Sequence, residues 1–386
     1  MKNKVLITGG AGFIGNAIIE KIHQDFDVVV LDNLSPQIHG ENYEDSYLYQ
    51  QVKDKVELII GDVCDEALVA KALEGVDYII HLAAETGTGQ SMYELNRYTQ
   101  VNIAGLSNML ETILKKKLPV KKIVLSSSRS VYGEGMYRCA EHGVVVPNSR
   151  VVEDMLKKDF EPKCPICAKD VELIPTDVTS LPKPISYYAF TKLAQEEMLK
   201  VMCPSMGLDY TIFRYQNVFG PGQSLSNPYT GILSIFSKRL LNNQDINIFE
   251  DGLESRDFVH VKDVAAYTIN ALTNEKTNGQ TLNVGSGESV SVIRVAETLK
   301  AMYGSTSSIG VTGDFRIGDI RHNKADMVKT IACCGFTPEY TFDLGMKEFS
   351  AWVLEELSKE KKPEGVSFDE SIEELVARGM LLKGTK

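Results

Sequence analysis

No stretch of the sequence is long and apolar enough to cross a membrane, and the start of the chain lacks the apolar run of a secretory signal. After Lys4 come only three apolar residues, Val5 to Ile7, whereas a membrane helix needs about 20 and a signal peptide about 7–15 in succession. We therefore expect a cytoplasmic protein without a membrane partner.

Positive charge is also scarce. The chain has 41 lysines and arginines against 52 acidic residues, a net charge of −11. This balance argues against a nucleic-acid partner or an anionic lipid surface, but it permits a local basic pocket for a phosphorylated small molecule. The seven cysteines are odd in number, which suits a reducing compartment better than a disulfide framework. The 386 residues suffice for two closely joined domains or one large α/β domain with additions.

A glycine-rich turn joins a predicted strand, residues 4–8, to a helix that continues to about His23. In such a turn, backbone N–H groups and the helix N-terminus can meet a pyrophosphate. The next strand, 27–31, ends at Asp32. A carboxylate at this position can accept hydrogen bonds from ribose hydroxyls and would repel a 2′-phosphate. The pattern predicts dinucleotide binding, with NAD preferred over NADP.

Further predicted strands alternate with helices, which indicates a parallel sheet covered on both faces. Asp62, near the end of one of them, can meet the adenine or simply cap the following helix. We predict a helix near 102–116 and an α/β fold of the Rossmann type, with a doubly wound sheet. The further strands cover residues 56–63, 77–84, 122–128 and 210–215.

Tyr188 and Lys192 are four residues apart, so on a helix they lie on one face, one turn from each other. An ammonium beside a phenol favours the phenolate, which makes the tyrosine a usable base nearer neutral pH. The pair alone also occurs by chance on solvated helix faces.

Five motifs occur in order: Thr8-Gly-Gly-Ala-Gly-Phe-Ile-Gly15, a serine run before Val131-Tyr-Gly133, Tyr188-x-x-x-Lys192, Asn217-Val-Phe-Gly-Pro-Gly222, and Arg256-Asp-Phe-Val-His-Val-Lys-Asp263. Over residues 4–355 the chain resembles the extended short-chain dehydrogenase/reductase family, in its nucleotide-sugar epimerase/dehydratase branch. The resemblance implies an NAD-binding domain over 1–220, to which 258–285 return, and a smaller substrate domain of 221–257 and 286–358. It also implies a homodimer. The residues it places on NAD are Gly9, Gly12, Phe13, Ile14, Gly15, Asp32, Asn33, Asp62, Val63, Leu82, Ala83, Ala84, Asn102, Tyr188 and Lys192.

By the same resemblance, Ser128, Tyr188 and Lys192 form the catalytic group. Ser128 would hydrogen-bond the reacting sugar oxygen, although a serine there can also cap a strand end. Tyr188 would take the proton from the hydroxyl at sugar carbon 4, and Lys192 would hold the nicotinamide ribose. The family's dehydratases carry acidic residues directly after the serine or threonine, where this chain has Arg129 and Ser130.

Elimination of water is therefore disfavoured, which leaves 4-epimerisation or a net oxidation or reduction. The rivals to an epimerase are a nucleotide-sugar 4-reductase or dehydrogenase and, in another class, a non-catalytic NAD-binding regulator. Retention of the serine, tyrosine and lysine argues against the regulator. Asp32 argues against an NADPH-dependent reductase.

Ser128 and Tyr188 are separated by 59 residues, more than is usual in the family, and the extra length at 134–183 contains two ligand pairs. Cys139 and His142 are followed, after 21 residues, by Cys164 and Cys167. Such pairs can close a tetrahedral Zn²⁺ site. We expect a structural zinc in a knuckle-like insertion, although a redox dithiol or four unrelated side chains would give the same spacing.

Within the branch, the stretch Ser128–Gly135, the insertion and the loop 81–91 resemble the dTDP-L-rhamnose 4-epimerases, so a dTDP-sugar is the expected substrate. Cys333 and Cys334 are expected in the core or a strand. Residues 359–386 are read as a charged linker, 359–362, and a C-terminal helix over 368–381. The residues assigned to the substrate are Gly89, Gln90, Ser91, Ser128, Arg129, Asn217, Arg256 and Arg321, the last two as pyrophosphate clamps.

Overall fold

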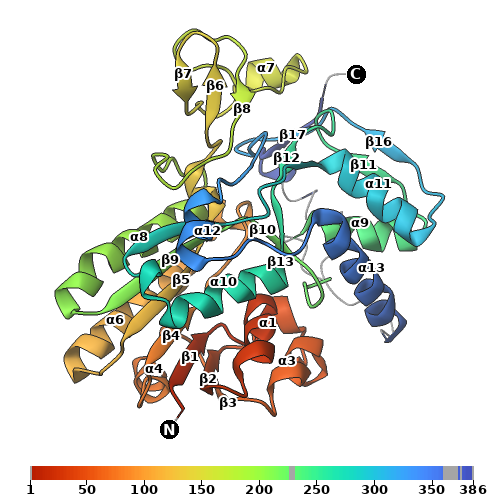
Figure 1. Ribbon diagram of the computed structural model, residues 1–386. Helices are drawn as coiled ribbons and strands as arrows, with labels where there is room; N and C mark the ends of the chain where they lie inside the picture. Colours follow the sequence, from red (N-terminus) through yellow and green to blue (C-terminus); the bar gives the residue numbers. More distant parts are fainter. Residues whose placement is uncertain (1, 226–230, 360–372, 374–375, 385–386) are drawn as a thin grey trace.

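The computed structural model describes residues 2–225, 231–359, 373 and 376–384. At its centre lies a sheet of seven strands in the order β14-β9-β5-β4-β1-β2-β3, with every neighbouring pair parallel (Figure 1). The predicted doubly wound α/β fold is confirmed. The strands are β1 (Lys4–Thr8), β2 (Asp27–Asp32), β3 (Glu57–Ile60), β4 (Tyr78–His81), β5 (Lys122–Ser128), β9 (Asp209–Tyr215) and β14 (Gln280–Val284).

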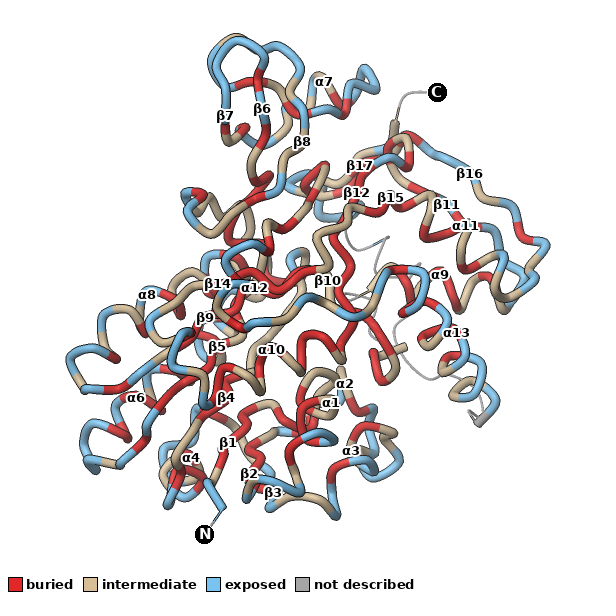
Figure 2. The backbone as a smooth tube through the Cα atoms, in the orientation of Figure 1, coloured by how far each residue is buried: buried red, intermediate tan, exposed pale blue. Residues whose placement is uncertain are grey.

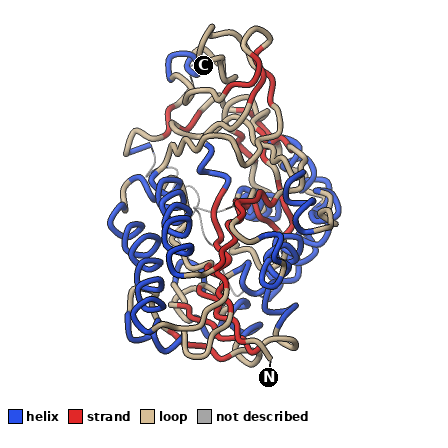
Figure 3. The backbone as a smooth tube through the Cα atoms, turned by 60° about the vertical axis from the view of Figure 1, so that its left-hand side comes forward, coloured by secondary structure: helices blue, strands red, loops and turns tan. Residues whose placement is uncertain are grey.

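Helices cover both faces of this sheet, which is why its central strands are almost wholly apolar rather than alternating (Figure 3). One face packs on α4 (Glu66–Ala72), α6 (Gly105–Lys116) and α8 (Tyr187–Met206). The other face packs on α1 (Phe13–Ile22), α10 (Val261–Thr273) and α12 (Val328–Cys334). Cys333 and Cys334 end α12 and pack on this core, so the expectation of core residues is right and that of a strand is wrong.

The predicted strands 56–63 and 77–84 end earlier than expected, at Ile60 and His81. The residues beyond them form loops at the carboxyl edge of the sheet, where polar backbone is left for a ligand. The predicted helix 102–116 begins at Gly105, after a π-helical turn over Thr99–Ala104.

The C-terminal part has its own apolar cluster, formed by α9 (Ile232–Leu241), α11 (Val292–Tyr303) and α13 (Phe342–Lys359) with short strands. The predicted domain boundaries stay a prediction. The short strands pair as β10 (Asn217–Phe219) with β13 (Phe258–His260), β11 (Ile246–Ile248) with β16 (Ile309–Val311), and β12 (Ser255–Arg256) with β15 (Val290–Ser291).

The insertion stands away from the central sheet as a small antiparallel unit (Figure 1). It consists of β6 (Tyr137–Cys139), β7 (Gly143–Val145), α7 (Val152–Leu156) and β8 (Glu172–Leu173). Figure 2 shows it largely exposed, with buried positions along β6. Tyr137 and Val145 are buried around the cysteines, whereas Met155 and Phe160 pack in a second small cluster with Phe315.

The C-terminus differs from the prediction. Lys359 still belongs to α13, and half of the predicted helix 368–381, namely 368–372, 374 and 375, lies outside the described residues. Leu381 and Leu382 form β18, which pairs antiparallel with β17 (Phe315–Arg316). No helix among the described residues is long and apolar enough to span a bilayer.

Candidate active site

A cavity of about 360 Å³ lies at the carboxyl ends of β1, β4 and β5, the usual ligand position in doubly wound sheets. Ser128 also lines it. Of the residues predicted to hold NAD, those lining the cavity are Gly9, Gly12, Phe13, Ile14, Gly15, Asp32, Asn33, Asp62, Val63, Leu82, Ala83, Ala84, Tyr188 and Lys192.

The glycine turn requires its glycines for two different reasons. Gly9 has φ +69°, and a Cβ there would lie 2.7 Å from the backbone nitrogen of Ala83. A Cβ on Gly15 would lie 2.3 Å from the carbonyl oxygen of Gly10. The first glycine permits close approach to β4, and the second permits packing of α1 on the turn. The N-terminus of α1 is thus left open to the cavity.

Asp32 is fixed at the end of β2 by two backbone donors. The N–H groups of Ala11 and Leu34 donate to its carboxylate, both at 2.9 Å. Burial raises the pKa of Asp32, and these donors with the charge of His39 oppose the rise. The carboxylate faces the cavity and suits ribose hydroxyls, so the residues present fit NAD.

Asp62 does not cap a helix, which was the alternative reading. The cap of α4 is Asp65, whose side chain accepts from the N–H groups of Ala67 and Leu68. Asp62 accepts instead from the N–H of Cys64 at 2.8 Å and lines the cavity.

Ser128 and Tyr188 both line the cavity and lie within hydrogen-bonding reach of each other. Ser128 ends β5, and its Oγ accepts from the N–H of Ser130 at 3.2 Å, so it also has the capping role considered above. Tyr188 lies in the first turn of α8, which is capped by Ser186. Burial raises the pKa of Tyr188, while the hydrogen bond with Ser128 and the charge of Arg129 lower it.

Lys192 is buried one turn further along α8, and its Nζ donates to the carbonyl oxygen of Ser126 at 2.8 Å. Burial lowers the pKa of Lys192 to about 7, against which the carboxylate of Glu196 acts. The pKa of Lys192 therefore lies close to neutral pH, and a nearby negative group such as a phenolate would favour the charged ammonium form.

A buried ion pair ties the two catalytic elements together. Glu196 of α8 accepts from Arg214 of β9 through Nε at 2.9 Å and through a terminal nitrogen at 2.7 Å. Glu196 also accepts from the hydroxyl of Ser127 in β5. The guanidinium of Arg214 lies over the ring of Tyr132, 4.6 Å from its centroid. The strand that carries Ser128 is thus fixed against the helix that carries Tyr188.

Four predicted ligand contacts lie elsewhere. Asn102 is fully buried and bonds the backbone of Glu85 and the hydroxyl of Thr191, so it positions a loop and does not line the cavity. Gln90 and Ser91 are buried in a short 3₁₀ turn next to Gly89 and are bonded within their own loop or to its neighbours. None of these three lines the cavity.

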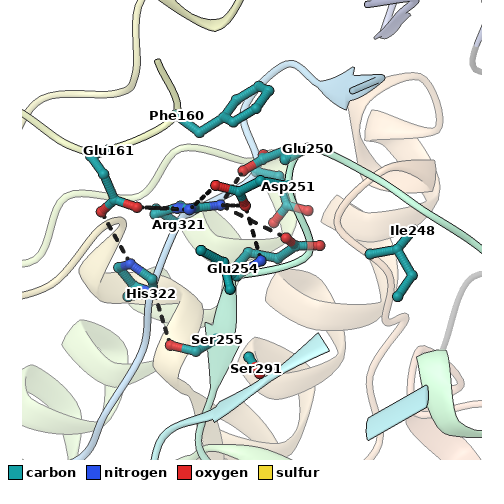
Figure 4. Close-up of polar contacts among 12 residues, drawn as sticks. Phe160, Glu161, Ile248, Glu250, Asp251, Glu254, Ser255, Ser291, Arg321 and His322 are labelled. Carbon is teal, nitrogen blue, oxygen red and sulfur yellow. Dashed lines mark hydrogen bonds and ion pairs between the residues drawn. The ribbon is translucent and has the colours of Figure 1, made fainter. Parts of the chain in front are cut away.

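Arg321 is not free to clamp a phosphate in this structure (Figure 4). Its side chain is 1% exposed, and its guanidinium bonds the carboxylates of Glu161, Glu250 and Asp251. These partners come from segments 70 or more residues away, so the sequence did not reveal them.

Arg256, the other predicted clamp, lies beside residues 319–321. It donates to the carbonyl oxygens of Ile320 and Arg321 and to the carboxylate of Asp319. Arg129 lines a smaller cavity with Glu134, Gln216 and His322, and Gln216 also lines the large one. Asn217 starts β10, and its Oδ1 is buried without a hydrogen-bond partner among the described residues.

Two further residues were missed from sequence. Arg316 is half-buried, its guanidinium lies over the ring of Phe249, 5.0 Å from the centroid, and its buried Nε finds no hydrogen-bond partner within the described chain. Gln223 lines the large cavity, and its Oε1 is likewise unpartnered in the described part. For Arg316, the arginine content of residues 315–322 is the only signal that the sequence offers, and for Gln223 the sequence offers none.

The four predicted metal ligands do converge. The ligand atoms of Cys139, His142, Cys164 and Cys167 lie within 4.8 Å of one another. Cys139 Sγ is 3.6 Å from His142 Nδ1 and 3.7 Å from Cys167 Sγ. Tetrahedral zinc at ordinary bond lengths places such atoms about 3.6–3.8 Å apart, so the donor set fits Zn²⁺. Ala168 takes the left-handed backbone, φ +59°, at the position where knuckles often carry glycine.

Comparisons with known proteins agree with this geometry. Residues 5–150 and 164–285 match the model of the NAD dependent epimerase/dehydratase family. The chain is 37% identical over 361 residues to a dTDP-L-rhamnose 4-epimerase of Burkholderia thailandensis, covering 92% of this chain and 96% of that protein.

Among solved structures, a UDP-glucose 4-epimerase of Thermotoga maritima with UDP-glucose has a TM-score of 0.74 at 27% identity, covering 92% of this chain and 99% of that one. A UDP-N-acetylglucosamine 4-epimerase of Methanobrevibacter ruminantium, in complex with UDP-N-acetylmuramic acid, has a TM-score of 0.72 at 30% identity, covering 92% and 100%.

Proposed function

The chain belongs to the NAD-dependent epimerase/dehydratase family, and from that premise we propose that this NAD-dependent nucleotide-sugar 4-epimerase interconverts dTDP-L-rhamnose and dTDP-6-deoxy-L-talose. The observation that carries the reaction type is the convergence of Ser128, Tyr188 and Lys192 on one cavity, with Arg129 in place of a dehydratase carboxylate. The 37% identical relative supports the sugar.

Bound NAD supplies the acceptor and later the donor of the hydride at sugar carbon 4. The chain's own residues move the proton and hold the sugar. Tyr188 takes the proton from the 4-hydroxyl as general base, and Ser128 holds the reacting oxygen by a hydrogen bond. The ammonium of Lys192 stabilises the phenolate and binds the nicotinamide ribose. The hydride held on the cofactor would return to carbon 4 from the opposite face of the 4-keto sugar, and Tyr188 would return its proton to the 4-oxygen, which restores the hydroxyl with inverted configuration.

The reaction is tested by incubating the protein with dTDP-L-rhamnose and catalytic NAD and following the sugar by NMR. An epimerase forms the talose epimer without net NADH, whereas a dehydrogenase accumulates NADH in proportion to product and a 4-reductase requires added reductant. No turnover with dTDP-L-rhamnose, but turnover with a UDP- or GDP-sugar from a parallel panel, would overturn the proposed sugar.

We also propose that Cys139, His142, Cys164 and Cys167 hold a structural Zn²⁺. A site with four protein ligands has no open position for chemistry, and a small insertion needs such a staple because its core is small. Metal analysis should find about one zinc per chain in the wild type and far less in Cys164→Ser. Equal zinc in both proteins would contradict this assignment.

Finally, we propose a cytoplasmic homodimer. None of the seven cysteines forms a disulfide, which suits a reducing compartment. Light scattering that finds a monomer at micromolar concentration would contradict the dimer.

A further inference from the structure

Arg129 is a cation beside the catalytic residues to which the protein gives no bonded partner. It follows Ser128 directly, at the start of a 3₁₀ turn, η4 (Arg129–Tyr132). Its side chain is half-buried, and within the described part of the chain nothing forms a hydrogen bond or an ion pair with its guanidinium. By contrast, three buried arginines each bond a carboxylate, namely Arg214, Arg256 and Arg321. A half-buried arginine without an acceptor points to a negative charge that forms only during the reaction.

Arg129 lies behind one wall of the large cavity. It lines the smaller cavity, of about 10 Å³, whereas Ser128 and Tyr188 line the large one. Gln216 lines both cavities. The peptide from Ser128 to Arg129 and the side chain of Gln216 therefore form the wall between them. The smaller cavity has room for about one water molecule, so the charge of Arg129 acts on the large cavity through this wall.

Four groups from three parts of the chain surround the phenol of Tyr188. They are Ser128, which bonds it, the edge-on ring of Tyr98 in α5 (Leu95–Tyr98) at a centroid distance of 6.5 Å, Lys192 one turn along the same helix, and Arg129. Only Lys192 and Arg129 can carry a positive charge. The charge of Arg129 lowers the pKa of Tyr188, and Tyr188 in turn raises the pKa of Arg129.

The two cations differ in how firmly they hold their charge. Burial lowers the pKa of Lys192 to about 7. Burial and the charge of Arg256 lower the pKa of Arg129 only to about 10, and the carboxylates of Asp319 and Glu134 act in the opposite sense. At pH 7, about half of the protein molecules therefore have a charged Lys192, whereas nearly all have a charged Arg129. Before a phenolate forms, Arg129 is the cation whose charge does not depend on it.

We propose that Arg129 acts on the reaction through Tyr188: its unpaired guanidinium stabilises the phenolate, so that Tyr188 can accept the proton of the sugar hydroxyl even while Lys192 is neutral. This rests on the proposed function, in which Tyr188 is the base. The proton passes from the 4-hydroxyl to the phenolate oxygen, the hydride passes from carbon 4 to NAD, and Arg129 keeps all its protons. A carboxylate bonded to Arg129 would cancel its effect on Tyr188, which explains why the guanidinium has no bonded partner.

A purely structural role for Arg129 predicts a different response of stability. Such an arginine would stabilise the fold through the nearby carboxylates of Glu134 and Asp319. The pKa of Arg129 is lowered overall, so the folded protein disfavours its charged form, and loss of the charge should leave the thermal midpoint unchanged or raise it. Activity and stability should therefore not fall together.

The test compares Arg129→Met, Arg129→Gln and Arg129→Lys with wild type in the NAD-loaded protein. The matched control is Lys183→Met. Lys183 is also half-buried, and its backbone N–H donates to Val131 in η4, but its Nζ bonds only the carbonyl oxygen of Pro147 and the side-chain oxygen of Asn148. The value of kcat/KM for dTDP-L-rhamnose is measured from about pH 6 to pH 9. The tyrosinate absorbance is titrated in each protein, with Tyr188→Phe as the blank.

Arg129→Met should move the acidic limb of the kcat/KM profile upward by about 1 pH unit, which is a loss of about tenfold on that limb and little loss above it. Arg129→Gln should do the same and serves if Arg129→Met does not fold. Arg129→Lys should move the limb less, because it keeps the charge. The titration of Tyr188 should move with the limb, while the affinity for NAD and the thermal midpoint stay at or above the wild-type values.

A fall of kcat/KM by the same factor at every pH would overturn the proposal, and so would a profile and a titration equal to those of Lys183→Met. Wild-type protein that turns over no sugar refutes the proposed function, and the titration of Tyr188, which needs no sugar, then decides the role of Arg129. Wild-type protein with neither turnover nor a titration that Tyr188→Phe removes overturns both proposals.

Discussion

Replacing Arg214 by methionine would leave the carboxylate of Glu196 buried without its cation. Glu196 is fully buried, the side chain of Arg214 is 3% exposed, and two short hydrogen bonds join them. Breaking such a pair by removing one partner costs about 3–5 kcal/mol. Ser127 still donates to Glu196, and Lys200 lies 3.6 Å away, so we expect the lower end, about 3 kcal/mol. For a chain of this length that lowers the thermal midpoint by about 4 °C.

The loss should depend on pH with a definite sign. An unpaired buried carboxyl is relieved by protonation, so the folded variant takes up a proton more readily than its unfolded chain. The difference from wild type should therefore be largest at pH 8 and shrink towards pH 5. Because Tyr132, which follows Ser128 closely in the chain, loses the guanidinium over its ring, kcat should also fall.

Calorimetric melting at both pH values measures this. Lys115→Met, which removes an exposed pair with Glu111, is the control and should shift the midpoint by less than 1 °C. The double variant Glu196→Gln/Arg214→Met should recover part of the loss, since it removes both charges. An Arg214→Met midpoint within 1 °C of wild type at pH 8, or an equal loss at pH 5, would refute the reasoning.

Three shorter predictions follow from the same structure. Tyr188→Phe should lower kcat by about 10²–10⁴-fold with unchanged NAD affinity; near-normal turnover would remove Tyr188 as the base. Asp32→Ala should weaken NAD binding and reduce the preference for NAD over NADP, with both dissociation constants measured by fluorescence titration. An unchanged ratio of the two constants would show that another group selects the cofactor. Glu254→Gln should raise the thermal midpoint at pH 8 but not at pH 5. Burial and the charge of Glu250 raise the pKa of Glu254 to about 7, so the wild type loses stability as the pH rises from about 4.5 through 7. An equal change of the midpoint at both pH values would contradict this.

Sequence reasoning predicted which residues come together in space where these residues are close neighbours along the chain. The turn at Gly9, the helical spacing of Tyr188 and Lys192, and the two metal-ligand pairs are local patterns, and the structure brings each together as expected. The two predicted ligand pairs also had to come together, and the short antiparallel unit of β6 and β7 brings Cys139 next to Cys167.

Reasoning failed where a residue's role is set by distant partners. Arg321 was read as a phosphate clamp because nothing near it in sequence reveals Glu161 or Glu250. Likewise, the predicted C-terminal helix was extended to residue 381 on its amphipathic pattern, whereas Leu381 pairs with Arg316 in a strand. Tertiary contacts override local propensity in both cases.

Backbone hydrogen bonds hold together the two ends of the insertion. The N–H of Lys183 donates to the carbonyl oxygen of Val131 at 2.8 Å, and that of Ile174 donates to Met136 at 3.2 Å. The chain thus leaves the domain of the central sheet and returns to it at nearly the same point. A lineage could gain, lose or exchange everything between these positions while Ser128 and Tyr188 keep their places.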